Sequence, residues 1–382
     1  MTAERVANSE TTIFTVVNTL AAKYNAVGLS QGAPDFDTPA WVLDIVREAF
    51  TLGRNQYAPL SGVPEFRQAI SDVYSRKYDL HFNPNTQITV TSGATEAIFD
   101  SVMAMCDPGD ELIVFEPFFD SYAGSAKMAG CRIKAVTLHL PDFTFDRKEL
   151  ENAITPKTKA ILINNPNNPS GKVYSREELT VISEIANKYD LTVISDEVYE
   201  NLVFDGLKHI PTASIPGLEN RTITINSTAK TFSATGWKIG YICAPEYLTA
   251  AVQAVHQWVT FAVNTPIQIA FSKILPQADR YSADFCTEME KRRNYLLERS
   301  ANWGFDPIRP SGSYFFMATF GKLSASSDMD FMEQLIRERH VALIPASPFY
   351  LNAKDEGQKL LRFNFVKSMA ALEQADKNMT MF

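Results

Sequence analysis

Residues 160–197 have the sequence AILINNPNNPSGKVYSREELTVISEIANKYDLTVISDE, in which a helical pattern separates two short apolar runs. The runs Ala160–Asn164 and Leu191–Ser195 have the length and composition of buried strands. Between them, Ser175–Tyr189 carries apolar residues at helical spacing, including Val181, Ile182, Ile185 and Ala186. A strand, a helix and a second strand in this order predict an α/β unit with parallel strands.

The same alternation continues on both sides of this unit. Further strand-like runs are Ile88–Thr91, Glu111–Phe115, Arg132–Leu138, Arg221–Asn226 and Ile239–Ala244, and further helical patterns are Thr95–Met105 and Glu246–Val259. We therefore expect an α/β fold with a mostly parallel sheet sandwiched by helices.

The pattern changes after about residue 280. Asp279–Ser300 is a long, charged amphipathic helix, followed by a strand-like Ser313–Thr319, a helix around Asp328–Arg339 and a strand near Leu360–Val366. These elements predict a smaller α+β domain. We expect a large domain at residues 44–280, reached through a helix at Trp41–Leu52. The N-terminal arm, residues 1–43, is expected to join residues 281–382 in the small domain.

Composition excludes several classes of protein. The 382 residues are 45% hydrophobic and 21% charged, as in ordinary globular proteins, and the net charge of −8 argues against a nucleic-acid partner. The five histidines show no HExxH spacing and the four cysteines no CxxC, so we expect no metal. Met1–Leu20 has no signal-peptide pattern, and with the sparse cysteines this predicts a cytoplasmic protein.

One uncharged stretch needs a separate interpretation. No formally charged residue lies between Glu246 and Lys273, and a membrane span needs about 20 mainly apolar residues. The stretch is interrupted by polar residues and a proline: Gln253, His256, Gln257, Asn264, Pro266 and Gln268. We interpret it as a buried helix followed by a loop, and expect no membrane partner.

Small polar residues follow several of the predicted strands, where ligands bind in open α/β sheets. Ser92–Thr95 closes one strand and opens a helix, so its backbone N–H groups could hold an anion such as a phosphate. A plain helix cap by Ser92 or Thr95 would use the same residues. The residues of the Asn-rich segment Asn164–Gly171 could simply form a turn, or their side-chain amides could donate hydrogen bonds to a bound anion.

Two charged groups follow later strands. Asp196 comes directly after a buried run, so its carboxylate needs a cationic partner or a metal, and the absence of a histidine cluster makes the metal less favoured. Lys230, in Ser227-Thr228-Ala229-Lys230, is surrounded by small uncharged residues, and desolvation there would lower its pKa and leave a nucleophilic amine. An ordinary surface lysine is the alternative. The SxxK spacing also occurs in serine acyl-transferases, but the chain has no KTG or SDN motif.

Together with five longer phrases, this order of motifs resembles the class I/II pyridoxal-phosphate-dependent aminotransferases of fold type I. The resemblance runs from about Ile13 to Phe365, and is greatest to the methionine, glutamine and kynurenine aminotransferase branch. The phrases are SQGAPDF at residues 30–36, NQYAP at 55–59, EPFFDSY at 116–122, TGWKIGY at 235–241 and LRFNF at 361–365.

The resemblance implies a pyridoxal 5'-phosphate cofactor, which makes residues 44–280 the cofactor-binding domain. Lys230 would form a Schiff base with the cofactor aldehyde and move the proton, while Asp196 would pair with the ring nitrogen. Tyr199 and Asn168 would donate to the ring oxygen, and Phe119 would stack on the ring face.

The phosphate and substrate groups are implied in the same way. Gly93, Ala94, Thr95, Ser227 and Lys238 would hold the phosphate. Tyr57 would reach the phosphate of a neighbouring subunit, making a homodimer. Arg362, Asn168 and the Gly32 N–H would bind the substrate carboxylate.

One residue that differs from a related branch of the family narrows the expected substrate. The aspartate and prephenate branch has a lysine where Thr95 stands, so aspartate is disfavoured as donor. Aromatic residues would suit an apolar, aromatic or thioether side chain: Phe14, Tyr57, Phe118, Tyr122, Trp258 and Phe261. We expect transfer of the amino group of methionine, glutamine or an aromatic, kynurenine-like amino acid to a 2-oxo acid. A cysteine-S-conjugate β-lyase using the same site is the alternative.

Overall fold

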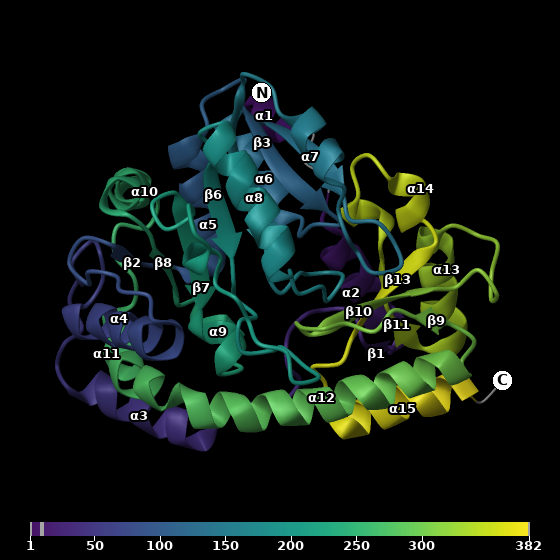
Figure 1. Cartoon of the computed structure of the whole chain (residues 1–382). Coiled ribbons are helices and arrows are strands. Elements are labelled where there is room, and N and C mark those ends of the chain that lie inside the picture. Colours follow the sequence, from purple (N-terminus) through teal and green to yellow (C-terminus); the bar gives the residue numbers. More distant parts are fainter. Residues whose placement is uncertain (1, 8–10, 381–382) are drawn as a thin grey trace.

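A seven-stranded sheet of order β2-β8-β7-β6-β5-β3-β4 dominates the computed structural model, which describes residues 2–7 and 11–380 (Figure 1). Its strands are β2 Ile88–Thr91, β3 Glu111–Glu116, β4 Arg132–Thr137, β5 Thr158–Asn164, β6 Thr192–Asp196, β7 Thr222–Ser227 and β8 Gly240–Cys243. Neighbouring strands pair in parallel except β8, which is antiparallel to β2 and β7. The expected mostly parallel α/β fold is confirmed.

The unit β5-α8-β6 lies in the middle of this sheet and determines which residues meet at the carboxyl ends of its strands. Helix α8, Arg176–Lys188, begins with a capping box in which Ser175 and Glu178 satisfy each other's backbone N–H groups. Strands β5 and β6 then pair up to Asn164 opposite Asp196. The carboxyl ends of both strands therefore present their polar side chains at one place.

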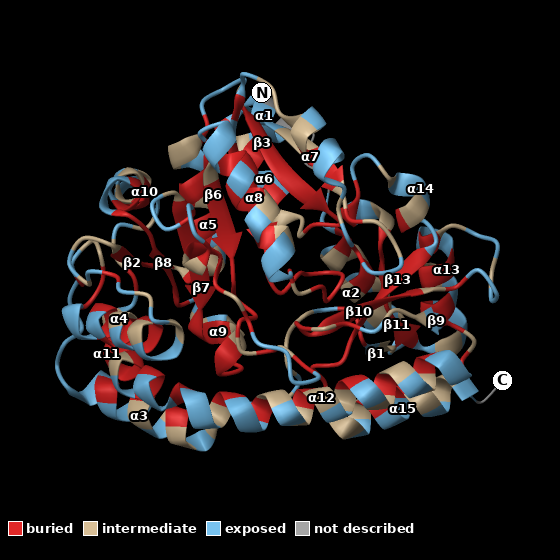
Figure 2. Ribbon diagram, viewed as in Figure 1, coloured by how far each residue is buried: buried red, intermediate tan, exposed pale blue. Residues whose placement is uncertain are grey.

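Both faces of the large sheet are buried, as Figure 2 shows by the red strands, except along the edge strand β4, which is mostly half-buried. On one face, Leu112, Val114 and Leu162 pack with α5 Gly93–Met105, α6 Ser121–Ala129 and α10 Glu246–Val259. On the other face, Ile113 and Ile161 pack with α7 Arg147–Ala153 and α8. This burial explains why the strands are continuous apolar runs rather than alternating ones.

A second, antiparallel sheet of order β12-β13-β10-β9 is built from the later part of the chain. Its strands are β9 Asp306–Pro307, β10 Phe315–Thr319, β12 Ile344–Pro345 and β13 Leu360–Asn364, and beside it β1 Val27–Gly28 pairs in parallel with β11 Val341–Ala342. The helices of this part are α2 Ile13–Tyr24, α13 Asp328–Gln334 with the π-turn Leu335–Arg339, α14 Lys354–Gly357 and α15 Met369–Thr380. The pairing of β1 with β11 joins the N-terminal arm to the C-terminal part of the chain.

Helix α12, Ala278–Asn302, runs along the base of the molecule below both sheets in Figure 1. Its buried face includes Phe285, Met289, Arg293 and Leu296, which follow one another at intervals of about one turn, and the remaining positions are more exposed. The remaining elements are α1 Glu4–Ala7, α3 Ala40–Thr51, α4 Pro64–Tyr78, α9 Thr228–Thr231, α11 Thr265–Ile274 and the 3-10 turns Thr212–Ser214, Thr235–Trp237, Leu275–Gln277 and Ser347–Phe349. The domain division at residues 44 and 280 stays a prediction, since both positions fall inside helices, α3 and α12.

The uncharged stretch between Glu246 and Lys273 differs partly from expectation. Helix α10 is present, but the expected loop is short because α11 begins at Thr265. The Asn264 side chain accepts from the Ile267 N–H at 3.0 Å and Pro266 lies in the first turn, so a cap signal starts the second helix. None of the helices in residues 2–7 and 11–380 combines the length and apolarity needed to cross a membrane.

The Asn-rich turn after β5 docks on the segment leading into β10. Gly171, at φ +75°, accepts from the N–H groups of Ser311 and Gly312, both at 2.9 Å. A Cβ on Gly171 would lie 2.3 Å from Pro310 Cβ and 2.6 Å from the Phe315 oxygen. A glycine here therefore allows the turn, and Asn168 within it, to lie against the second sheet.

We expect Gly171→Ala to destabilise the protein more than Gly53→Ala. Both glycines have positive φ, which costs a residue with a Cβ about 1–2 kcal/mol, but Gly53 has open space around it and Gly171 does not. Urea unfolding of the two variants measures the difference. Equal losses of stability would show that the docked turn tolerates the methyl group.

Candidate active site

A cavity of about 330 Å³ opens at the carboxyl ends of β5, β6 and β7, beside the first turn of α5. It is lined by every site residue predicted from the sequence except Tyr57: Gly32, Gly93, Ala94, Thr95, Phe119, Asn168, Asp196, Tyr199, Ser227, Lys230, Lys238 and Arg362. Residues from both sheets and from the N-terminal arm therefore meet in one site.

Lys230 lies on the short helix α9, directly after β7. The Tyr314 hydroxyl donates to the Lys230 carbonyl at 2.6 Å and holds that helix, while Lys230 Nζ donates to the Gly32 carbonyl at 3.0 Å. Burial lowers the pKa of Lys230 to about 8, with Asp196 opposing and the charges of Arg362 and Lys238 adding to the effect. A substantial fraction of neutral, nucleophilic amine is then present near neutral pH.

Asp196 ends β6 with its carboxylate buried in the cavity wall. Tyr122 donates its hydroxyl to Oδ2 at 2.7 Å, and the Val198 N–H donates to Oδ1 at 3.3 Å. Burial raises the pKa of Asp196 to about 6, although these donors and the charge of Lys230 lower it. The carboxylate is thus ionised at neutral pH but poorly solvated, which favours a cationic partner.

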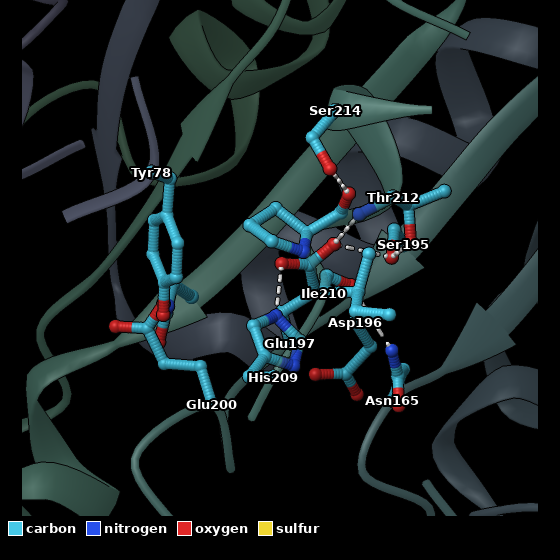
Figure 3. A network of polar contacts seen from close by, with 12 residues as sticks. Tyr78, Asn165, Ser195, Asp196, Glu197, Glu200, His209, Ile210, Thr212 and Ser214 are labelled. Atoms are coloured by element: carbon cyan, nitrogen blue, oxygen red, sulfur yellow. Dashed lines mark hydrogen bonds and ion pairs between the residues drawn. The ribbon is translucent and has the colours of Figure 1, made fainter. Parts of the chain in front are cut away.

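The neighbouring Glu197 serves a different purpose. In Figure 3, Ser195, His209 and Thr212 converge on its carboxylate; His209 Nε2 lies at 2.8 Å and the Thr212 N–H donates at 2.9 Å. Glu197 does not line the cavity. Its charge still contributes to the raised pKa of Asp196.

The turn before α5 is arranged to receive an anion. The N-cap residue, Ser92, makes no side-chain capping bond, so the plain-cap alternative fails. The N–H groups of Gly93, Ala94 and Thr95 have no hydrogen-bond acceptor among the described residues. Lys238 Nζ donates to Thr95 Oγ1 at 3.3 Å, so a cation stands beside these N–H groups.

Arg362 is 1% exposed in the centre of β13. Its Nη1 donates to Asn168 Oδ1 and its Nη2 to the Ser30 carbonyl, both at 2.7 Å, while Nε has no partner. Burial lowers the pKa of Arg362 to about 9, against the effects of Tyr199 and Asp120. A buried guanidinium with no carboxylate paired to it among the described residues is suited to bind an incoming anion.

The remaining predicted residues lie as follows. The Tyr199 hydroxyl has no hydrogen bond to another described residue, and burial raises its pKa, so it remains a donor. Phe119 packs on Phe14 with ring centroids 6.4 Å apart. Ser227 Oγ accepts from the Ala229 N–H at 3.1 Å and caps α9. Tyr57 is 84% exposed outside the cavity.

The aromatic residues named from the sequence divide between cavity, core and surface. Phe14 lines the cavity, and Phe118 is buried in the core. Trp258 and Phe261 are exposed near the end of α10, outside the cavity of their own chain. These two therefore do not line the substrate site of this chain.

Sequence reasoning missed Tyr122 as the donor to Asp196, and Phe315 as the ring that lies 4.1 Å from the Arg362 guanidinium. Asn164 was named only within a turn, yet its side chain donates to the Asp196 carbonyl and accepts from the Asn168 N–H. The phrase EPFFDSY at 116–122 contains Tyr122 and was the available signal.

The model of the family described as aminotransferase class I and II matches residues 24–377. The chain belongs to this family. The solved N-succinyldiaminopimelate aminotransferase of Mycobacterium tuberculosis is 38% identical, covers 99% of both chains and has a TM-score of 0.96. Kynurenine–oxoglutarate transaminase 3 of Mus musculus is 36% identical over 98% of this chain and 89% of its own length. Methionine aminotransferase of Escherichia coli (strain K12) is 34% identical over 95% and 93%.

The protein is therefore an aminotransferase of fold type I that uses pyridoxal phosphate and acts on amino acids and 2-oxo acids. The cavity fits this cofactor. It offers a desolvated amine, a buried carboxylate for a cationic ring nitrogen and unpaired N–H groups for a phosphate. The acyl-transferase alternative for the SxxK spacing is excluded by this membership.

We expect Tyr122→Phe to shift the pH dependence of cofactor binding. The Tyr122 hydroxyl stabilises ionised Asp196, so its removal raises that pKa further above about 6. Attraction of the ionised carboxylate for a cationic ring is present above the pKa and lost as pH falls through it. Titration of the apo-enzyme with pyridoxal phosphate from about pH 5 to 8 should give a higher midpoint for the variant.

The phosphate titrates in the same range, but equally in both proteins. Tyr247→Phe, which changes a tyrosine that is 62% exposed, is the matched control. Identical midpoints for wild type and Tyr122→Phe would contradict the role of the hydroxyl.

Proposed function

We propose that this enzyme transfers the amino group of methionine, glutamine or an aromatic, kynurenine-like amino acid to a 2-oxo acid, with Lys230 as the amine that carries the cofactor. The observation that supports this proposal most strongly is the set of charged side chains that line the cavity. Its cationic lining residues within the described chain are Lys230, Lys238 and Arg362. Each has a separate task in this proposal.

Lys230 moves the proton. When bound, pyridoxal phosphate supplies an aldehyde that condenses with amines and a ring that accepts the electron pair of the substrate Cα–H bond. The Lys230 amine takes that proton from Cα and returns it elsewhere, as a group with a pKa of about 8 can do near neutral pH. Its hydrogen bond to the Gly32 carbonyl keeps the amine beside the residue whose N–H we assign to the substrate carboxylate.

Asp196, Asn168 and Tyr199 hold the ring. The ionised Asp196 carboxylate keeps the ring nitrogen protonated, and Tyr122 keeps that carboxylate in place. Asn168 Oδ1 already accepts from Arg362, so its Nδ2 is left to donate to the ring oxygen or to a carboxylate. The unpaired Tyr199 hydroxyl can donate to the same ring oxygen, and Phe119 covers the ring face.

The phosphate is bound by the N–H groups of Gly93, Ala94 and Thr95, with Lys238 and Ser227 beside them. Lys238 acts as a point charge, because an ammonium lacks the fixed fork of a guanidinium. Gly240 supports this turn: a Cβ there would lie 2.5 Å from the Gly93 carbonyl carbon and 2.6 Å from Ala94 N. Only a glycine allows β8 to approach the turn this closely.

Arg362 binds the α-carboxylate of the substrate, assisted by Asn168 and by the Gly32 N–H. With Lys230 and Lys238 engaged, the described lining offers no further cation for a second carboxylate. Phe14, Phe315 and Val198 instead give the cavity an apolar wall. Relatives named as kynurenine and methionine aminotransferases support the same substrate class.

We also propose a cytoplasmic homodimer in which Tyr57 of each subunit reaches the phosphate of the other. Tyr57 lies outside the cavity of its own chain and packs edge-on against Phe261, with centroids 5.7 Å apart. Trp258 is likewise 84% exposed. This exposed aromatic surface is what a subunit interface would cover. The four cysteines are free thiols, consistent with a reducing compartment.

We expect borohydride reduction of the holoenzyme to attach the cofactor to Lys230. Hydride reduces the bond between cofactor and lysine to a stable amine, and peptide mapping identifies the labelled residue. Lys238 is the internal control, since it lies in the same cavity but beside the phosphate. Label on any residue other than Lys230, or none on fully reconstituted enzyme, would overturn the assignment.

We expect methionine, glutamine and aromatic donors to convert the bound cofactor from its aldehyde to its amine form, while aspartate converts it poorly. Absorbance of the cofactor in single-turnover mixtures measures this directly. Arg362→Lys should lower kcat/KM for every donor about ten- to hundredfold, because a charged hydrogen bond contributes roughly 1.5–3 kcal/mol. Conversion by aspartate or N-succinyldiaminopimelate alone would contradict the apolar substrate class. Pyruvate and ammonia from a cysteine conjugate, without a 2-oxo acid, would favour the β-lyase.

A further inference from the structure

Two carboxylates and an imidazole are buried together between α5 and α10, outside the cavity. Glu96 and Asp100 lie one turn apart on α5, and His256 faces them from α10. Asp100 and His256 are 0% exposed and Glu96 is 7% exposed. No sequence motif predicted this cluster, because Glu96 and His256 are 160 residues apart.

The cluster is connected to the turn that faces the phosphate. His256 Nδ1 lies 3.0 Å from Glu96 Oε1. The other oxygen of Glu96, Oε2, accepts from the backbone N–H of Ser92, the N-cap residue of α5. Glu96 thus holds the N–H that precedes the three unpaired N–H groups of Gly93, Ala94 and Thr95.

A carboxylate in this place has an electrostatic cost. The first turn of a helix attracts a phosphate through its N–H groups and its dipole, and a negative charge directly behind that turn opposes the attraction. A protonated imidazole at 3.0 Å cancels the charge of Glu96. Asp100 Oδ2 lies farther from the same nitrogen, at 3.7 Å, and neither Asp100 oxygen has a hydrogen bond.

The ionisation of the three groups agrees with this geometry. Burial disfavours a charged imidazole, but the attraction of the nearby Glu96 and Asp100 carboxylates outweighs burial and raises the pKa of His256 to about 9. Burial raises the pKa of Asp100, partly against the effect of His256. Burial also acts on Glu96, but His256, Thr260 and the Ser92 N–H together lower the pKa of Glu96.

We propose that the Glu96–His256 ion pair is a positioning element for the cofactor phosphate: Glu96 fixes the Ser92 N–H, and His256 cancels the negative charge that Glu96 brings behind the turn. Neither residue touches the cofactor. The pair acts through the orientation and the potential of the N–H groups of residues 93–95. The inference rests on the phosphate placement of the proposed function and is independent of the substrate class.

The test compares binding of pyridoxal phosphate with binding of pyridoxal, which has the same ring and aldehyde but no phosphate. His256→Gln leaves Glu96 charged and unpaired, so the Kd for pyridoxal phosphate should rise about tenfold or more, while that for pyridoxal changes less than about twofold. Glu96→Gln keeps an acceptor for Ser92 and removes the charge, so its Kd for pyridoxal phosphate should stay within about threefold of wild type. The double variant should resemble Glu96→Gln.

His139→Gln is the matched control, because His139 forms a pair with Glu149 at 2.9 Å on the surface, away from the site. It should change neither Kd. If His256→Gln alone does not fold, the double variant decides. If the double variant binds pyridoxal phosphate with a Kd within about threefold of wild type, the proposal is supported. If its Kd rises about tenfold, the proposal is overturned.

Other results would also overturn the proposal. Equal losses for pyridoxal and pyridoxal phosphate in His256→Gln would show a structural role only. A larger loss in Glu96→Gln than in His256→Gln would contradict the charge argument. A stoichiometric divalent metal in the purified enzyme, removed by His256→Gln, would make the cluster a metal site.

Lys238→Gln separates this inference from the proposed phosphate placement. If Lys238→Gln weakens pyridoxal phosphate but not pyridoxal, the phosphate lies at the turn. A missing effect in His256→Gln then refutes only the ion-pair inference. If Lys238→Gln shows no such selectivity, the phosphate placement itself fails.

Discussion

Parallel pairing of β5, β6 and β7 brings Asn164, Asp196 and Ser227 to one edge of the large sheet. The active site depends on this constraint, because each of these strands ends in a polar residue that lines the cavity. A shift of one residue in the register of β6 would turn Asp196 to the opposite face. The continuous apolar packing on both faces fixes that register, so the core and the site are specified by the same contacts.

The buried charges of the site lower the stability of the ligand-free enzyme. Arg362 is buried without a paired carboxylate among the described residues, and burial also opposes the charges of Lys230 and Asp196. Ligands that bring an anion to Arg362 and a cationic ring to Asp196 compensate these charges. Binding and stability are therefore linked, and cofactor binding should protect the folded state as any ligand specific for it does.

Local patterns predicted local structure well. The apolar spacing within residues 175–189 placed α8 to within a residue, and the buried strands were found because β-branched runs between turns have few other interpretations. Helix α4 was missed, and α11 was taken for a loop because an uncharged run shows no polar face to mark its period.

Contacts between residues far apart in the sequence were the main feature of the site that the sequence did not predict. Tyr122 meets Asp196 across 74 residues, and His256 meets Glu96 across 160, and no spacing rule describes such pairs. The residues that the family phrases pointed to do converge on one cavity. Tyr57 is the exception, since it lies on the surface of its own chain.

The two halves of the cavity come from different parts of the chain. Residues 93–238 supply the lining groups that we assign to the cofactor, whereas Phe14, Gly32, Phe315 and Arg362 form the side that we assign to the amino acid. During synthesis on the ribosome, which proceeds from the N-terminus, the vitamin-binding half is complete long before Arg362 leaves the exit tunnel. A nascent chain could thus acquire its cofactor pocket early, yet it cannot select a substrate until β13 has joined β10 and β12 near the very end of translation.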